Sequence, residues 1–276
     1  MEQRQLDELR DWFDQYVAGF YGDDEYINTN VKQKEDHTQR VCKETRYIAD
    51  KLGLTDPQKR VAEAIALFHD IGRFEQFVRF RTFHDIQSIR HSLLGGQILR
   101  QKRILESFEE PLQHVILKAV EYHAVKQLPE DLNGPCLMFA QLIRDADKLD
   151  IYDVITRYYE QYKDNPQDSS LGLGLPNHPE CSPHVVEKML RGESIDYSEL
   201  RTLNDLKLTQ LGWIHDINFA ATLERIKECR FLETLAGLIP ITAETETIKQ
   251  RIFSYVDERL KKNKQIKKSG CSMFRA

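Results

Sequence analysis

The stretch from Val61 to Gly72 constrains the fold more than any other part of the sequence. Its first residues, VAEAIALF, are almost wholly apolar, so a helix formed by them draws the following His69-Asp70 into the interior. A carboxylate removed from water costs several kcal/mol unless a charge compensates it, and a neutral imidazole supplies little. Histidine and aspartate are ordinary ligands of zinc, iron and manganese, so the pair indicates a metal site. Gly72 would let the chain leave the helix directly after it.

The same dipeptide occurs twice more, at His84-Asp85 and His215-Asp216, so the pair alone identifies nothing. At these two places no other potential ligand lies at a matching helical position. We therefore interpret both as structural or exposed residues. His114, His178 and His184 receive the same interpretation.

Other predicted helices also place a potential ligand on an apolar face. Residues three or four apart share one face of a helix, and His37 begins such a stripe with Val41, Thr45, Ile48 and Leu52. The further candidates found in this way are His91, His123 and Asp147. Buried imidazoles and carboxylates that arrive on separate helices satisfy one another best around a metal ion.

The chain is expected to be all-α, because no segment shows a convincing alternation of apolar and polar residues. We predict an N-terminal helix packing on the core within residues 1–30, a metal-binding core over 31–160, a C-terminal helical extension of the same domain over 161–262, and a basic disordered tail over 263–276. The extension should include a long helical hairpin over residues 203–239. Residues 164–183, with four prolines and two glycines, form either a lid or a surface loop.

Composition excludes several classes of protein. Apolar residues make up 41% and charged residues 30%, as in ordinary globular chains. No apolar run reaches the roughly 18 residues of a membrane span, and the acidic N-terminus is unlike a signal peptide, so we expect a cytoplasmic protein without a membrane partner. The five cysteines form no CxxC pair, which argues against disulfides and a thiolate zinc site. A net charge of −5 gives no strong indication of nucleic-acid binding. The sequence does not decide the oligomeric state, and a homodimer is one possibility.

The sequence motifs around the candidate ligands resemble those of the HD-domain superfamily of metal-dependent phosphohydrolases. The matching motifs are HTQRV from His37, FHDIGRF from Phe68, HSLLGG from His91, EYH ending at His123, and RDADKLD around Asp147. The resemblance covers residues 31–155. The segment GWIHDINF at residues 212–219 is similar to the C-terminal helices of small bacterial stand-alone HD-domain proteins.

The resemblance implies a helical bundle, with additional N- and C-terminal helices, in which a divalent transition metal (Mn, Fe, Co, Ni or Zn) is held by His37, His69, Asp70 and Asp147. In branches with two middle histidines, the positions matching His91 and His123 bind a second metal, and the aspartate at Asp70 bridges. One or two metals per chain are therefore expected. The alternative is a single metal, with His91 and His123 binding substrate phosphate or donating a proton. The adjacent histidines and GYP motif of cyclic di-GMP phosphodiesterases are missing, so that substrate is not expected.

We expect a phosphomonoesterase or phosphodiesterase that acts on a nucleotide or another small phosphorylated metabolite through metal-activated water. Asp70, His91, His123 and Lys148 are the predicted catalytic residues. Lys148, next to Asp147, and Arg40, three residues after His37, are the cations expected to bind the substrate phosphate. Arg73, Arg79 and Arg81, which alternate with phenylalanines, either clamp phosphate or are solvated charges on a loop. Asp145 and Asp150 are interpreted as capping residues or as groups that orient the ligands.

Two other functions fit the same residues. A minority branch of the superfamily uses six such ligands to hold two irons and cleave a small organic substrate with dioxygen, and the step from His69 to His91 fits either branch. Iron content with oxygen uptake would identify it. The second alternative is a non-catalytic nucleotide sensor, which would bind nucleotide tightly without turnover. The complete ligand set disfavours a sensor.

Overall fold

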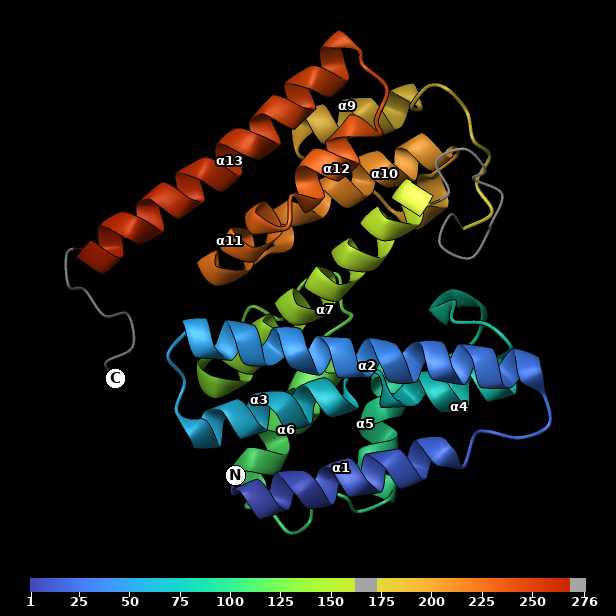
Figure 1. The fold of residues 1–276 in the computed structure, drawn as a ribbon, viewed down its shortest axis with the longest axis vertical. Coiled ribbons are helices and arrows are strands. Elements are labelled where there is room, and N and C mark those ends of the chain that lie inside the picture. The colour runs from blue at the N-terminus through green and yellow to red at the C-terminus, as the bar shows by residue number, and fades with distance from the viewer. Residues whose placement is uncertain (162–172, 269–276) are drawn as a thin grey trace. The chain divides into compact units, whose positions relative to one another are not determined.

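The structure, a computed structural model, describes residues 1–161 and 173–268, and every regular element in those ranges is a helix (Figure 1). The all-α prediction is thereby confirmed. The chain divides into two compact units, Met1–Asp150 and Ile151–Ala276. The candidate ligands all belong to the first unit. Whether the second unit is an extension of the same domain, as expected from the sequence, stays a prediction.

The first unit consists of six helices, one short 3-10 helix and the beginning of a seventh helix. In chain order they are α1 (Gln3–Ala18), α2 (Glu25–Lys51), α3 (Asp56–Phe68), α4 (Ile71–Phe80), η1 (Asp85–Gln87), α5 (His91–Gln101), α6 (Glu110–Tyr122) and α7 (Gly134–Gln161). The central helix α3 packs against α1, α2 and α6, while α4 packs against α2 and α5. Figure 1 shows α3 and α4 following one another between α1 and α2.

Capping residues set the beginnings of α2 and α3. Thr55 and Gln58 form a capping box, with Pro57 in the first turn, and α3 begins at Asp56. The Asp24 carboxylate accepts a hydrogen bond from the Ile27 backbone N–H, so α2 begins at Glu25. The helix therefore starts six residues before the predicted core, which was expected to begin at residue 31.

The chain turns sharply at Asp70. Helix α3 ends at Phe68, Asp70 has φ −103° and ψ 16°, and α4 starts at Ile71. The expectation that Gly72 ends the helix is wrong, because Gly72 lies inside α4. A Cβ on Gly72 would stand 2.8 Å from the Gly95 nitrogen, so the two glycines allow α4 and α5 to approach closely. That approach places the start of α5 beside the turn at Asp70.

The second unit contains shorter helices than the sequence predicted. They are α9 (Pro183–Arg191), η2 (Tyr197–Glu199), α10 (Leu203–Gly212), η3 (Trp213–Asp216), α11 (Ala220–Glu228), α12 (Phe231–Gly237) and α13 (Ala243–Lys268). The expected long hairpin over 203–239 is wrong, because the chain breaks at η3 and again between α11 and α12, where Arg230 takes a left-handed conformation with φ 56°. Helix α10 contacts α9 and α12, and α13 contacts α9 and α11.

The predicted basic tail is partly helical, since α13 continues to Lys268. The rest of the tail, residues 269–276, and the first nine residues of the predicted lid or surface loop, residues 164–172, lie outside the described residues. Along the described ranges, none of the helices combines the length and the apolar character that crossing a bilayer needs.

Candidate metal centre

Six consecutive helices, α2 to α7, bring the predicted ligands together. His37 lies in α2, His69 and Asp70 form the turn between α3 and α4, and His91 is the first residue of α5. His123 follows the last residue of α6, and Asp147 lies in α7. The histidines and Asp70 are buried, and the Asp147 side chain is 20% exposed. All six predicted metal ligands therefore meet in one region.

The first group of converging atoms is formed by His37, His69 and Asp70. The Nε2 atoms of His37 and His69 are 3.2 Å apart, and His37 Nε2 is 3.4 Å from Asp70 Oδ2. Asp147 joins this group, since its Oδ1 atom lies 3.3 Å from His37 Nε2 and 3.9 Å from His69 Nε2.

The second group is formed by Asp70, His91 and His123. The Nε2 atoms of His91 and His123 are 3.1 Å apart, and they lie 3.3 and 3.5 Å from Asp70 Oδ1. Asp70 thus points one carboxylate oxygen at each group. This is the geometry of a carboxylate that bridges two positions.

Two histidines are oriented by the backbone of the helix that precedes them. His69 donates its Nδ1 hydrogen to the Ala66 carbonyl at 2.7 Å, and His123 donates to the Val120 carbonyl at 2.8 Å. Each carbonyl belongs to the last turn of its helix, where backbone acceptors lack a helical partner. Because a carbonyl can only accept, the Nδ1 atom must hold the proton, and a neutral ring leaves its Nε2 lone pair free.

The other two histidines are oriented by carboxylates. His37 Nδ1 is 2.7 Å from Asp150 Oδ2, and His91 Nδ1 is 2.8 Å from both oxygens of Asp85. All four imidazoles therefore direct Nε2 into the centre and use Nδ1 for an outer hydrogen bond. Histidines that bind metals are held in this way in most known sites.

The donor set fits divalent cations on two observations. First, two Nε2 atoms that face each other at 3.1 or 3.2 Å need a proton or a metal ion between them, because two lone pairs would repel one another. Second, donors bound to one ion at about 2.0–2.2 Å lie about 3 to 3.5 Å apart around an octahedron or tetrahedron. Most of the distances within each group are in that range. His37, His69, Asp70 and Asp147 would hold one ion, and Asp70, His91 and His123 a second.

The electrostatics also favour positive charge at this place. Burial and the charge of Lys34 lower the pKa of His37, but hydrogen bonds to Asp147, Asp150 and Asp70 outweigh them and raise it to about 10. Burial lowers the pKa of His69 and of His91 to about 4, so both rings are neutral near pH 7. Despite burial, the Lys34 charge and the histidines hold the pKa of Asp70 well below its usual range.

Lys34 is a functional candidate that the sequence reasoning missed. Its Nζ atom lies 2.8 Å from Asp70 Oδ2 and 5.3 Å from the centre of the Phe83 ring, and its side chain is 19% exposed. Lys34 precedes His37 by three residues and so shares its face of α2. That spacing could have identified it.

The predicted phosphate-binding cations are in different situations. Arg40 makes two hydrogen bonds with Asp150, at 2.5 and 3.1 Å. Arg73 contacts Asp85 at 3.0 Å and lies 3.5 Å from Asp70 Oδ1. The exposed Arg79 and Arg81 pair with Glu75 and Asp24, respectively. Lys148 is half-buried in α7. Only Arg73 among these arginines is placed beside a predicted metal ligand.

Of the two carboxylates that contact the Nδ1 atoms of histidines, Asp150 has an expected role and Asp85 does not. Asp150 orients His37, in agreement with one of its two interpretations. The interpretation of Asp85 as a residue without matching partners is wrong, because it binds His91. That contact crosses an irregular segment, so no helical spacing could have revealed it. His84 is exposed, and His215 packs against Tyr255 with ring centres 4.5 Å apart.

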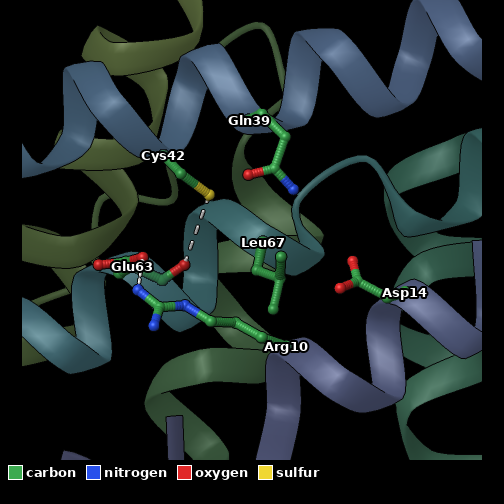
Figure 2. Close-up of a pocket in the computed structure, with 6 residues that line it drawn as sticks. All are labelled: Arg10, Asp14, Gln39, Cys42, Glu63 and Leu67. Atoms are coloured by element: carbon green, nitrogen blue, oxygen red, sulfur yellow. Dashed lines mark hydrogen bonds and ion pairs between the residues drawn. The ribbon is translucent and has the colours of Figure 1, made fainter. Parts of the chain in front are cut away.

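A cavity of about 120 Å³ lies elsewhere in the first unit, between α1, α2 and α3. It is lined by Arg10, Asp14, Gln39, Cys42, Glu63 and Leu67 (Figure 2). Buried Glu63 is paired with Arg10 and Arg46, and burial raises the pKa of the Cys42 thiol to about 12. This cavity contains none of the converging histidines, so the chemistry of the candidate centre does not involve it.

No curated protein and no solved structure matches the chain. A family model does match: the HD domain, over residues 35–152. The matched segment begins just before His37 and ends just after Asp150, so it includes all six predicted metal ligands, while Lys34 lies one residue before it. HD domains bind divalent metals and typify a superfamily of metal-dependent phosphohydrolases. The helical architecture and the two His-Asp groups agree with this match, so residues 35–152 of the chain form an HD domain.

Proposed function

We propose that this protein is a metal-dependent phosphohydrolase, a phosphomonoesterase or phosphodiesterase, that acts on a nucleotide or another small phosphorylated metabolite. The proposal rests on one observation: Asp70 points one oxygen at each of two groups of imidazoles whose free Nε2 atoms converge. Pairs of metal ions about 3.5–4 Å apart are typical of enzymes that hydrolyse phosphate esters.

A bound divalent cation would supply a water of lowered pKa and would stabilise negative charge on the phosphoryl oxygens. The residues of the chain provide the surroundings for that chemistry. Asp150 and Asp85 keep His37 and His91 aimed inward, and the carbonyls of Ala66 and Val120 do the same for His69 and His123. Asp70, held between both groups, would orient the attacking water.

Lys34 and Arg73 are the cations best placed to bind the phosphate. Lys34 contacts Asp70 Oδ2, while Arg73 lies near Asp70 Oδ1, so the two approach the same carboxylate from its two oxygens. Phosphate oxygens are favoured partners for both side chains. Arg40, Arg79, Arg81 and Lys148 stay predictions from the sequence, and the ion pairs of the three arginines support a structural role.

The test is a screen of phosphate esters with protein purified without chelator, with manganese, cobalt, nickel, zinc or iron added. We expect metal-dependent release of phosphate or of a nucleoside monophosphate, abolished by chelator and by Asp70→Asn. His215→Gln is the matched control, because it changes the same dipeptide at a place distant in sequence from the HD domain. It should retain the wild-type rate.

The two alternatives give different results in the same experiments. A di-iron oxygenase would contain iron and would consume oxygen with its organic substrate, while phosphate esters would stay intact. A nucleotide sensor would bind nucleotides tightly, as measured by calorimetry, without turnover under any metal. Either result would contradict the proposed hydrolysis.

A further inference from the structure

Asp85 has an unusual position for a residue outside the helices that hold the predicted ligands. It is the first residue of η1, in the segment that joins α4 to α5. Both of its carboxylate oxygens lie 2.8 Å from His91 Nδ1. It also accepts hydrogen bonds from Arg73 and Gln76, each at 3.0 Å. The carboxylate is therefore fixed between α4 and the first residue of α5.

This contact determines which nitrogen of His91 faces the centre. A carboxylate can only accept, so the Nδ1 atom is the protonated one and a neutral ring leaves the Nε2 lone pair free. His91 Nε2 lies 3.3 Å from Asp70 Oδ1 and 3.1 Å from His123 Nε2. Without Asp85 the ring would be able to rotate or to place its proton on Nε2, and in both cases it would lose its donor.

The Nδ1 atoms of the other three histidines have different partners that fix their ring orientations. His69 and His123 are held by carbonyls of rigid helical turns. Asp150, which holds His37, has a side chain only 2% exposed and is itself bound by Arg40. Asp85 has a side chain 31% exposed and lies in the three-residue 3-10 helix η1. The orientation of His91 thus depends on the most solvent-accessible of the four outer partners.

We propose that Asp85 is a positioning residue that fixes His91 as a ligand and thereby sets the affinity of the second cation position, formed by Asp70, His91 and His123, without affecting the first. The proposal rests on the two cation positions of the proposed function. It assigns a role to the His84-Asp85 dipeptide in which the aspartate, and not the histidine, is the functional member.

The first experiment measures the His91 ring itself and needs no metal. Long-range ¹H–¹⁵N spectra of the metal-free protein distinguish a proton on Nδ1 from one on Nε2. We expect a single Nδ1–H form for His91 in the wild type and a mixture of both forms in Asp85→Ala. Ser88→Ala is the matched control, because Ser88 also bonds to Gln76 within the same segment but has no contact with His91. It should preserve the wild-type spectrum.

The second experiment measures the two metal affinities by manganese titration, with paramagnetic resonance to count coupled pairs. We expect Asp85→Ala to weaken the second affinity about 10- to 100-fold and to leave the first unchanged, as is usual when an outer partner of a metal ligand is removed. Asp85→Asn, which keeps an oxygen acceptor, should lie between the wild type and Asp85→Ala. Ser88→Ala should match the wild type.

Asp85 also binds Arg73, which lies near Asp70, so Asp85→Ala could change the metal affinity through Arg73 instead of through His91. Adding Arg73→Met to Asp85→Ala distinguishes these two routes. If Asp85 acts through His91, the Asp85→Ala loss of affinity is the same with arginine or with methionine at position 73, so the double-mutant cycle gives no coupling between the two changes. If it acts through Arg73, the loss disappears in the Arg73→Met background, and the proposal is overturned.

The remaining outcomes are also decisive. An unchanged His91 spectrum in Asp85→Ala, or two metals bound with wild-type affinities, overturns the role of Asp85 while leaving the proposed function intact. A wild-type protein that saturates at one metal removes the second position itself, which contradicts both the two-cation centre and the proposal for Asp85.

Discussion

Gly72 and His91 are in such close contact that a Cβ on Gly72 would stand 2.2 Å from the His91 carbonyl oxygen. The neighbouring Gly95 completes this contact between α4 and α5. Because Gly72 follows Asp70 by two residues, the close packing holds the first residue of α5 against the turn at Asp70. The arrangement of His91 around Asp70 therefore depends on a residue without a side chain.

We predict that Gly72→Ala destabilises the first unit by about 3 kcal/mol and weakens the second metal affinity, because the backbone of α5 has to move. Gly22→Ala is the matched control, since a Cβ there meets nothing within 4 Å. It should change stability by less than about 0.5 kcal/mol. Urea unfolding followed by circular dichroism measures the stability of both variants, and manganese titration measures the second metal affinity. Equal stabilities of the two variants would contradict the packing argument.

Asp70→Ala should remove both the bound metal and the activity while leaving the helix content nearly unchanged. Asp70 is the one residue shared by the two groups of converging atoms, and its loss leaves Asp147 as the only anionic ligand. Elemental analysis of the purified variant, together with its circular dichroism spectrum, tests this. Wild-type metal content would show that Asp70 is not a ligand.

His84→Gln and His215→Gln should each leave the metal stoichiometry at the wild-type value. The His84 side chain is exposed, and the His215 ring packs on Tyr255. Neither belongs to the two groups of converging donors found among the described residues. Elemental analysis of the two variants checks the expectation, and a lost metal in either would mean that a different His-Asp pair is the ligand.

The double variant His91→Ala, His123→Ala should reduce the count from two metals per chain to one. The remaining ion would be held by His37, His69, Asp70 and Asp147, whose donor atoms converge on one another without a donor from His91 or His123. We expect at least a 100-fold loss of affinity at the second position, because two of its three donors disappear. Titration with manganese measures it. If the wild type itself saturates at one metal and the variant does the same, these histidines bind substrate or transfer a proton instead.

Asp205 should make the stability of the second unit depend on pH. Although burial raises its pKa, hydrogen bonds from the Ser182 side chain and from the backbone N–H groups of Ser182, Arg201 and Thr202 lower it further than burial raises it. Its contribution is therefore fully present above the unfolded pKa of about 3.9 and declines as the pH falls toward the lower folded value.

We expect Asp205→Ala to cost about 3 kcal/mol at pH 7, because buried donors lose a charged acceptor, and to cost less at pH 3. Glu228→Gln, at an exposed position of α11, should have no effect at either pH. Urea unfolding at both pH values tests this. A cost that is the same at pH 3 and pH 7 would contradict the role of the carboxylate charge.

The sequence by itself determined the helical class and the inward-facing ligands. An apolar stripe with a period near 3.6 residues identifies the buried face of a helix, whatever that helix packs against. His37, His123 and Asp147 each stand on such a stripe, and a buried polar group needs a partner. The sequence also determines where α3 begins, because the capping box there is formed by Thr55 and Gln58, which are only three residues apart.

The tertiary structure alone decided which atoms meet. The contact of Asp85 with His91 crosses an irregular segment, where no repeat relates position to direction. Lys34 is a charged residue of the kind usually found in solvent, and only the packing of α2 on α4 brings it to Asp70. Gly72 was taken for a helix end because its true partner, the His91 backbone, is distant in sequence. Periodicity specifies the face on which a side chain lies, whereas the atoms that contact it depend on the packing of elements far apart in the chain.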